Sequence, residues 1–306
     1  MSTDLSIRRA HGGFTLIEMI VVIVITGILS TIVAVFVKQS VDSYVDATRR
    51  AELTDAADVS VRQMAREIRQ ALPNSLRVVC PATGNPGAGS CFVEFIVTSD
   101  GGRYRDTGDG STAGLPLVFN DSTACATTPN NCKFDVLGPP PTLAAGASGD
   151  YVVVYNLGSG YAPVDAYQLS GCAAAPGCNI AQVSAVAGNT LTLAGNPFAA
   201  QSPPLPSPNS RFQVVPFAAR AVTYACPTAV PGAVVRYAGY GIHAAQGVPP
   251  AGGSPATLLT NATCAVDYTP NVFLRNGLLY IAFTIRDSAA SEAVTVFQQI
   301  HVDNTP

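Results

Sequence analysis

Side chains that commonly carry catalysis are sparse in this chain of 306 residues. The only histidines are His11, His243 and His301, and the sequence contains no His-Glu-x-x-His zinc motif, phosphate-binding glycine loop or nucleophile elbow. His301 lies in an expected strand near the C-terminus, where a structural role is the simpler interpretation. We therefore predict no catalytic site, no cofactor and no small-molecule substrate, so that the chain is not an enzyme.

Glu18 is the one ionisable residue in an apolar run from Phe14 to Val37. These 24 residues would form a helix ~36 Å long, enough to cross a hydrocarbon core of ~30 Å with some tilt. A carboxylate in such a segment costs roughly 2.5–3.5 kcal/mol near the bilayer centre, so it is more often functional than incidental. We predict a membrane-spanning helix in which Glu18 needs a cationic partner.

The residues in front of this run set its orientation. Arg8 and Arg9 lie on the N-terminal side, so the positive-inside rule places that end in the cytoplasm and the rest of the chain outside it. A secretory signal would have a small-residue cleavage site after its apolar region. Here the small residues, Gly12 and Gly13, come before it, which is the reverse order. A simple signal anchor with a chance glutamate is the alternative.

The sequence Gly13-Phe-Thr-Leu-Ile-Glu18 resembles the prepilin signal of type IV pilins and type II secretion pseudopilins. The resemblance implies that prepilin peptidase cleaves between Gly13 and Phe14, removes a leader of residues 1–13, and that Phe14 is then N-methylated. It also implies an assembly role for Glu18, the fifth residue of the mature chain. The α-amino group of Phe14 in a neighbouring subunit is the nearest cation for Glu18, and such a pair would set the register between helices.

Eight cysteines lie beyond the apolar run and predict disulfide bonds, because an even number outside the cytoplasm usually forms a disulfide set. Zinc is the competing interpretation. No Cys-x-x-Cys pair occurs and histidines are few, so we predict no metal site. Eight cysteines allow 105 pairings, so connectivity is not determined. Proximity along the chain favours Cys80–Cys91, Cys125–Cys132, Cys172–Cys178 and Cys226–Cys264.

The helix is expected to continue beyond the membrane half, residues 14–37, into an amphipathic periplasmic half within residues 38–76. No proline or glycine occurs from Lys38 to Leu72, and Pro73 ends the helix. Apolar residues recur there every three or four positions, which predicts a stripe that packs on the chain's own β domain. Charged residues, Glu67 among them, occupy the opposite face. The stripe consists of Ala57, Val61, Met64, Ile68 and Leu72.

From residue 77 the chain changes to short apolar runs that are typical of strands. The clearest pair, 277–286 and 292–302, alternates with period two around a turn at 287–291. We predict an α+β, pilin-like fold, in which the long N-terminal α-helix packs on an antiparallel β-rich domain of residues 77–306. The other expected strands are 91–98, 151–155, 180–186, 190–193, 211–215, 221–224 and 233–240.

Five polar or Pro/Gly-rich stretches are expected to lie outside the core: 81–90, 100–114, 137–149, 196–209 and 248–255. The second contains Asp106-Thr-Gly-Asp109, which resembles part of a calcium loop but lacks the closing glutamate, so an exposed turn is the simpler interpretation. Arg77, Arg103 and Arg105 could bind an anion, although scattered exposed arginines are common. The formal net charge of −3 gives no indication of nucleic-acid binding.

A closer resemblance extends beyond the signal to the minor pilins of MSHA pilus biogenesis systems. Residues 44–50, 65–77, 236–240 and 275–306 carry it. The resemblance implies a low-abundance subunit that is anchored in the inner membrane by a single span, with its C-terminal domain in the periplasm. It further implies that the subunit joins other major and minor pilins and initiates or caps a type IV pilus filament.

Two residues of the apolar run bear on this interpretation. Val35 stands where major pilins usually have a helix-kinking proline, which argues against a bulk subunit. Glu18 is retained, which argues against the tip pseudopilins that lack this glutamate. A minor pseudopilin of the J type in type II secretion is the alternative. A membrane-tethered periplasmic enzyme or ligand-binding module is a third hypothesis, and it would need an organised polar pocket in the β domain.

Overall fold

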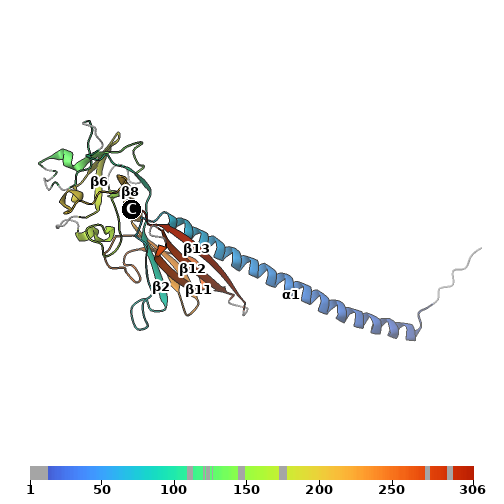
Figure 1. The fold of residues 1–306 in the computed structure, drawn as a ribbon. Coiled ribbons are helices and arrows are strands. Elements are labelled where there is room, and N and C mark those ends of the chain that lie inside the picture. Colours follow the sequence, from blue (N-terminus) through green and yellow to red (C-terminus); the bar gives the residue numbers. More distant parts are fainter. Residues whose placement is uncertain are drawn as a thin grey trace, which may run out of the picture. The chain divides into compact units, whose positions relative to one another are not determined.

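The structure is a computed structural model that describes residues 13–108, 113–119, 121, 125, 127–143, 149–171, 178–272, 276–287 and 292–306. The chain divides into two compact units, Met1–Glu52 and Leu53–Pro306, and each is described by itself. One long helix, α1 (Leu16–Arg69), contributes to both units (Figure 1). The expected boundaries at residues 13, 37 and 76 stay predictions.

Helix α1 ends at Arg69, three residues before the expected end at Leu72. Pro73 disfavours helical backbone at the residue before it. The backbone N–H of Leu72 instead donates to the carbonyl of Ile96 at 2.7 Å, and Ala71 forms a bridge with Val97. Leu72 therefore lies beside a strand and packs in a different apolar cluster from the helix stripe.

A seven-stranded antiparallel sheet forms the larger β layer of the second unit (Figure 1). Its order is β1-β2-β9-β10-β11-β12-β13. The strands β12 and β13 are the pair that alternation predicts, and they pair along their whole length, from Asn276 opposite Asp303 to Arg286 opposite Ala293. The strands are β1 (Arg77–Val79), β2 (Ser90–Ile96), β9 (Ala221–Pro227), β10 (Gly232–Tyr240), β11 (Ser254–Val272), β12 (Asn276–Arg286) and β13 (Ala293–Asp303).

A six-stranded sheet, also antiparallel, has the order β3-β8-β5-β6-β7-β4. Its strands are β3 (Asp100–Arg103), β4 (Lys133–Asp135), β5 (Tyr151–Val153), β6 (Ile180–Ala187), β7 (Thr190–Leu193) and β8 (Arg211–Val215). Among the described residues, the only helices after α1 are short 3₁₀ turns. These are η1 (Pro129–Cys132), η2 (Ala166–Gly171), η3 (Pro197–Ala200) and η4 (Phe217–Ala219).

The apolar stripe of α1 packs on the seven-stranded sheet, which confirms the predicted α+β architecture. Four stripe residues are fully buried against the inward side chains of β12 and β13. The residues of this contact are Ala57, Val61, Met64 and Ile68 from the helix, and Leu279, Ile281, Phe283, Ile285, Ile300 and Val302 from the strands.

Glu67 does not lie on a solvent face, as the sequence pattern suggested. Its Oε2 accepts hydrogen bonds from the Tyr224 hydroxyl and from Nε of Arg236, both at 2.8 Å. Burial together with the Glu67 carboxylate raises the pKa of Tyr224, so the phenol stays protonated. This charged contact links the helix to β9 and β10 beside the apolar stripe.

Met64→Ala is expected to lower the free energy of unfolding by about 2–5 kcal/mol, because it leaves a cavity between the helix and the sheet. Denaturant unfolding of the full chain in detergent would measure this loss. Val59→Ala is the matched control on the same helix, since Val59 is 57% exposed and should change stability by less than about 0.5 kcal/mol. Equal losses in the two variants would contradict the packing described here.

Two of the stretches expected to lie outside the core contribute to it. Tyr104, directly after β3, and Phe198, in η3, are fully buried in a cluster that belongs to the six-stranded sheet. The strand β3 itself was missed because it reads Asp-Gly-Gly-Arg. Its Gly101 fits there because a Cβ at this position would lie 2.9 Å from the carbonyl oxygen of Phe212 on the neighbouring strand.

Candidate processing and assembly site

The expected cleavage point lies immediately before α1. Gly13, Phe14 and Thr15 precede the first helical residue, and residues 1–12 lie outside the described part of the chain. A Cβ built on Gly13 would meet nothing within 4 Å, and Phe14 is 78% exposed. Within the described residues, the bond between Gly13 and Phe14 is therefore open to an enzyme.

Glu18 forms a capping box with Thr15 at the start of α1. The Thr15 hydroxyl oxygen accepts from the backbone N–H of Glu18 at 3.3 Å. In return, the Glu18 carboxylate accepts from the backbone N–H and the hydroxyl of Thr15, both at 3.5 Å. This reciprocal arrangement satisfies donors that a helix start leaves unpaired, and a negative charge is favoured there. The Thr-x-x-Glu spacing could have revealed it from the sequence, but our sequence analysis missed it.

The carboxylate of Glu18 remains exposed despite this cap. Its Oε2 is held near the helix start, four residues from Phe14, by contacts that are at the long limit for hydrogen bonds. A cation that approaches from another molecule could therefore bind the carboxylate without breaking a strong internal contact. The geometry fits a residue that orders its own helix and also accepts an external partner.

The first part of α1 presents an apolar surface to its surroundings. A window of 18 residues in this helix has a mean hydropathy of 3.0 and none of it is buried, so its length and composition would allow it to cross a membrane. The hydroxyls of Thr26 and Thr31 donate to carbonyls four residues earlier, each at 2.7 Å, and Ser40 does the same at 3.0 Å. All three hydroxyls are therefore satisfied within their own helix, and for Thr26 and Thr31, in the expected membrane half, a lipid environment requires this.

The structure joins three of the four cysteine pairs that proximity favours. Cys80–Cys91 links the end of β1 to β2, Cys226–Cys264 links β9 to β11, and Cys125–Cys132 closes a short loop. Their Cα atoms are 4.1, 5.6 and 5.4 Å apart, respectively. In the register of β2 and β9, Cys91 lies directly opposite Cys226. Cys172 lies outside the described residues, so its pairing with Cys178 stays a prediction.

Arg77 is not available to bind an anion. Its guanidinium donates from Nε and Nη2 to Oε2 of Glu94, at 3.1 and 3.0 Å, and its side chain is only 14% exposed. It also donates to the carbonyls of His243 and Ala244 and stacks 3.6 Å above the Tyr167 ring. Burial raises the pKa of Glu94, while the charge of Arg77 lowers it. The pair is therefore structural.

Other candidate residues also have local roles or lie outside the described chain. Arg103 donates from Nε to the carbonyl of Asn209 at 3.1 Å. The part of the possible calcium loop from Asp109 onward lies outside the described residues. Within the residues that are described, no group of three histidine, cysteine or acidic side chains is placed to hold a metal ion. The side chains of His243 and His301 are exposed.

Comparison with known families identifies the N-terminal region. Residues 8–34 match the family model described as "Prokaryotic N-terminal methylation motif". No curated protein matches the chain, and no solved structure matches it. The matched range includes Gly13, Phe14 and Glu18, together with the start of the apolar helix. This prepilin-type signal supports a type IV pilin-like or pseudopilin-like protein that prepilin peptidase processes, and hence a structural subunit rather than an enzyme.

Proposed function

We propose that the chain is a minor pilin of an MSHA-type type IV pilus, similar to the MSHA biogenesis minor pilin called MshO. In this role, the subunit is cleaved after Gly13, methylated at Phe14 and held in the inner membrane by residues 14–37 of α1, with residues 38–306 in the periplasm. It then joins other pilins through helix packing and initiates or caps the filament. The observation that carries the proposal is a processing motif at the start of an exposed apolar run, Phe14 to Val37, whose single ionisable residue is Glu18.

A minor pseudopilin of type II secretion would carry the same motif and the same α+β plan. Val35, in place of a helix-kinking proline, argues against a bulk subunit, and the retained Glu18 argues against the tip pseudopilins that lack this glutamate. The two functions differ in their readout. Deletion of a minor pilin should reduce surface filaments, whereas deletion of a pseudopilin should leave a secreted protein in the periplasm. If deletion stops secretion and leaves the surface filaments unchanged, the subunit belongs to the secretion system and not to a pilus.

Processing is tested by the mass of the N-terminal peptide of the membrane-purified protein. We expect a chain that starts at N-methylated Phe14. Gly13→Leu should block cleavage almost completely, and because a side chain at Gly13 meets nothing in the described chain, the block would report peptidase recognition. Gly27→Ala is the control, since a Cβ at Gly27 also meets nothing there. If the wild-type chain keeps residues 1–13 in cells with active peptidase, the proposed processing is wrong. The apolar helix would then be a simple signal anchor.

A further inference from the structure

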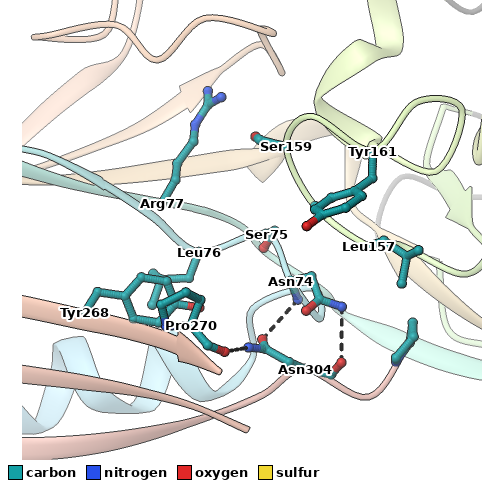
Figure 2. Close-up of a pocket in the computed structure, with 12 residues that line it drawn as sticks. Asn74, Ser75, Leu76, Arg77, Leu157, Ser159, Tyr161, Tyr268, Pro270 and Asn304 are labelled. Atoms are coloured by element: carbon teal, nitrogen blue, oxygen red, sulfur yellow. Dashed lines mark hydrogen bonds between the residues drawn. The ribbon is translucent and has the colours of Figure 1, made fainter. Parts of the chain in front are cut away.

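A pocket of about 540 Å³ lies in the second unit, between the segment that follows α1 and parts of β11 and of the loops after β5 and β13 (Figure 2). Four separate segments build it: residues 74–77, 157–161, 268–270 and 304–306. Its volume lies within the range of ~300–1,000 Å³ that is usual for small-molecule sites. None of the processing or assembly residues contributes to it.

Hydrogen bonds between asparagines hold these segments together (Figure 2). The backbone N–H of Asn74 donates to Oδ1 of Asn304 at 3.1 Å, and its Nδ2 donates to the carbonyls of Asn304 and Asn156 at 3.1 and 2.8 Å. Nδ2 of Asn304 donates in turn to the carbonyl of Pro270 at 2.8 Å. The pocket is therefore formed before any ligand binds, which lowers the entropy cost of binding.

The loop of residues 157–161 forms one wall of the pocket, and a glycine allows it to lie close to Asn74. Gly158 has a φ of +94°, and a Cβ on it would lie 2.5 Å from the carbonyl oxygen of Asn74. Only glycine allows this combination of backbone conformation and contact. The loop of residues 157–161 is thus fixed against the segment that leaves α1, and it places Ser159 and Tyr161 at the pocket.

The side chains that line the pocket carry no unbalanced charge. Among the described residues that line the pocket, Arg77 alone has a charged side chain, and its charge is balanced by Glu94. Figure 2 shows its guanidinium pointing away from Asn74 and Asn304. A charged ligand, such as a phosphate, would therefore find no unpaired charged side chain among these residues. A neutral ligand fits the lining better.

Aromatic rings alternate with hydroxyl and amide groups along the walls. Tyr161 is 63% exposed, and its hydroxyl points toward the side of Ser75 and Asn74 (Figure 2). Within the described part of the chain, the hydroxyls of Ser159 and Tyr161 make no hydrogen bond, so they are available to a ligand. Apolar surface comes from Tyr268, Leu76 and Pro270, and from Leu157 on the side of Tyr161 (Figure 2).

We propose that this pocket binds a neutral saccharide unit. A sugar ring has an apolar C–H face that can stack on a tyrosine ring and an edge of hydroxyls that can bind hydroxyl and amide groups. The exposed ring of Tyr161 supplies the stacking surface, and the hydroxyl of Ser159 supplies a polar contact. This inference goes beyond the proposed function, because it concerns residues 74–306 and does not depend on cleavage or on helix assembly.

The test uses the purified full chain in detergent on an array of neutral oligosaccharides, with sialylated and sulfated oligosaccharides as charged counterparts. We expect binding to neutral glycans, and a loss of about tenfold in affinity for Tyr161→Ala, as expected for the removal of one stacking contact. Tyr161→Phe should retain most of the affinity. Phe297→Ala is the matched control, because Phe297 is an aromatic residue that is 67% exposed on β13, outside the pocket.

Three results would overturn the inference. The first is the absence of binding to every neutral oligosaccharide. The second is binding that Tyr161→Ala leaves unchanged. The third is a photo-crosslink in cells from a reactive residue placed at Ser159 to another pilus subunit, which would make the pocket a protein docking site. None of these results would affect the N-terminal mass, so failure here is separable from failure of the proposed function.

Discussion

Glu18→Ala is expected to reduce the amount of this subunit in filaments by about tenfold or more. A charge-assisted hydrogen bond contributes roughly 1.5–3 kcal/mol, and tenfold corresponds to about 1.4 kcal/mol. Glu18 is the only ionisable residue from Phe14 to Val37, so that stretch has no other ionisable side chain to take its place. The measurement is an immunoblot of sheared filaments against the membrane fraction. Incorporation equal to that of the wild type would refute the assembly role.

The capping box requires controls that separate charge from helix capping. Glu18→Gln removes the charge, but glutamine can still complete a capping box with Thr15. Thr15→Ala removes the cap partner and keeps the carboxylate. If the charge drives assembly, Glu18→Gln should behave like Glu18→Ala, and Thr15→Ala should assemble. The opposite pattern would assign the effect to the start of the helix.

Arg77→Ala is expected to lower the free energy of unfolding by about 3–5 kcal/mol, because it leaves a buried carboxylate without its partner. Glu94 is 2% exposed in its side chain, and it would keep only hydrogen-bonding neighbours such as the Tyr240 hydroxyl. Denaturant unfolding of the full chain in detergent would measure the loss. Arg62→Ala is the control, since the exposed pair of Arg62 and Asp58 contributes at most about 1 kcal/mol.

The same variant should show a pH dependence of defined sign. Burial raises the pKa of Glu94 above its ordinary value of 4.5, and Arg77 opposes that rise. A carboxyl whose pKa is raised by folding stabilises the fold below its ordinary pKa and loses this contribution as pH rises through the folded-state pKa. Without Arg77 the pKa rises further. The difference between Arg77→Ala and the wild type should therefore be small at pH 4 and larger at pH 7, and a constant difference would contradict this account.

The helix and the last two strands could be predicted because their signals are local. In α1, the apolar stripe follows helical spacing over several turns, and in β12 and β13 the inward side chains alternate with period two. The disulfides follow proximity along the chain for the pairs that the structure describes. Gly13, Phe14 and Glu18 stand out for the same reason, since each is placed relative to its neighbours within a few residues.

Features that depend on distant residues could not be predicted. The strand β11 contains Pro255, Pro270 and Asn261, whose φ is +53°, so its sequence resembles a loop. Its pairing with β10 and β12 on either side decides its conformation. The salt bridge of Arg77 with Glu94 and the pocket beside it also join separate segments, and neither has a local pattern that marks it.

Two cysteines that are not bonded to each other lie close enough to form a non-native disulfide during oxidation. Cys91 and Cys226 are cross-strand neighbours, and neighbouring strands place their Cα atoms ~4.5–5.5 Å apart, which is also a separation that a disulfide bridges. Yet each is bonded to another partner, Cys80 and Cys264 respectively. A disulfide between Cys91 and Cys226 could therefore form even when β2 and β9 are correctly paired. It would leave the thiols of Cys80 and Cys264 without their native partners. We therefore expect correct pairing to form faster in a compartment that can rearrange disulfides as well as form them.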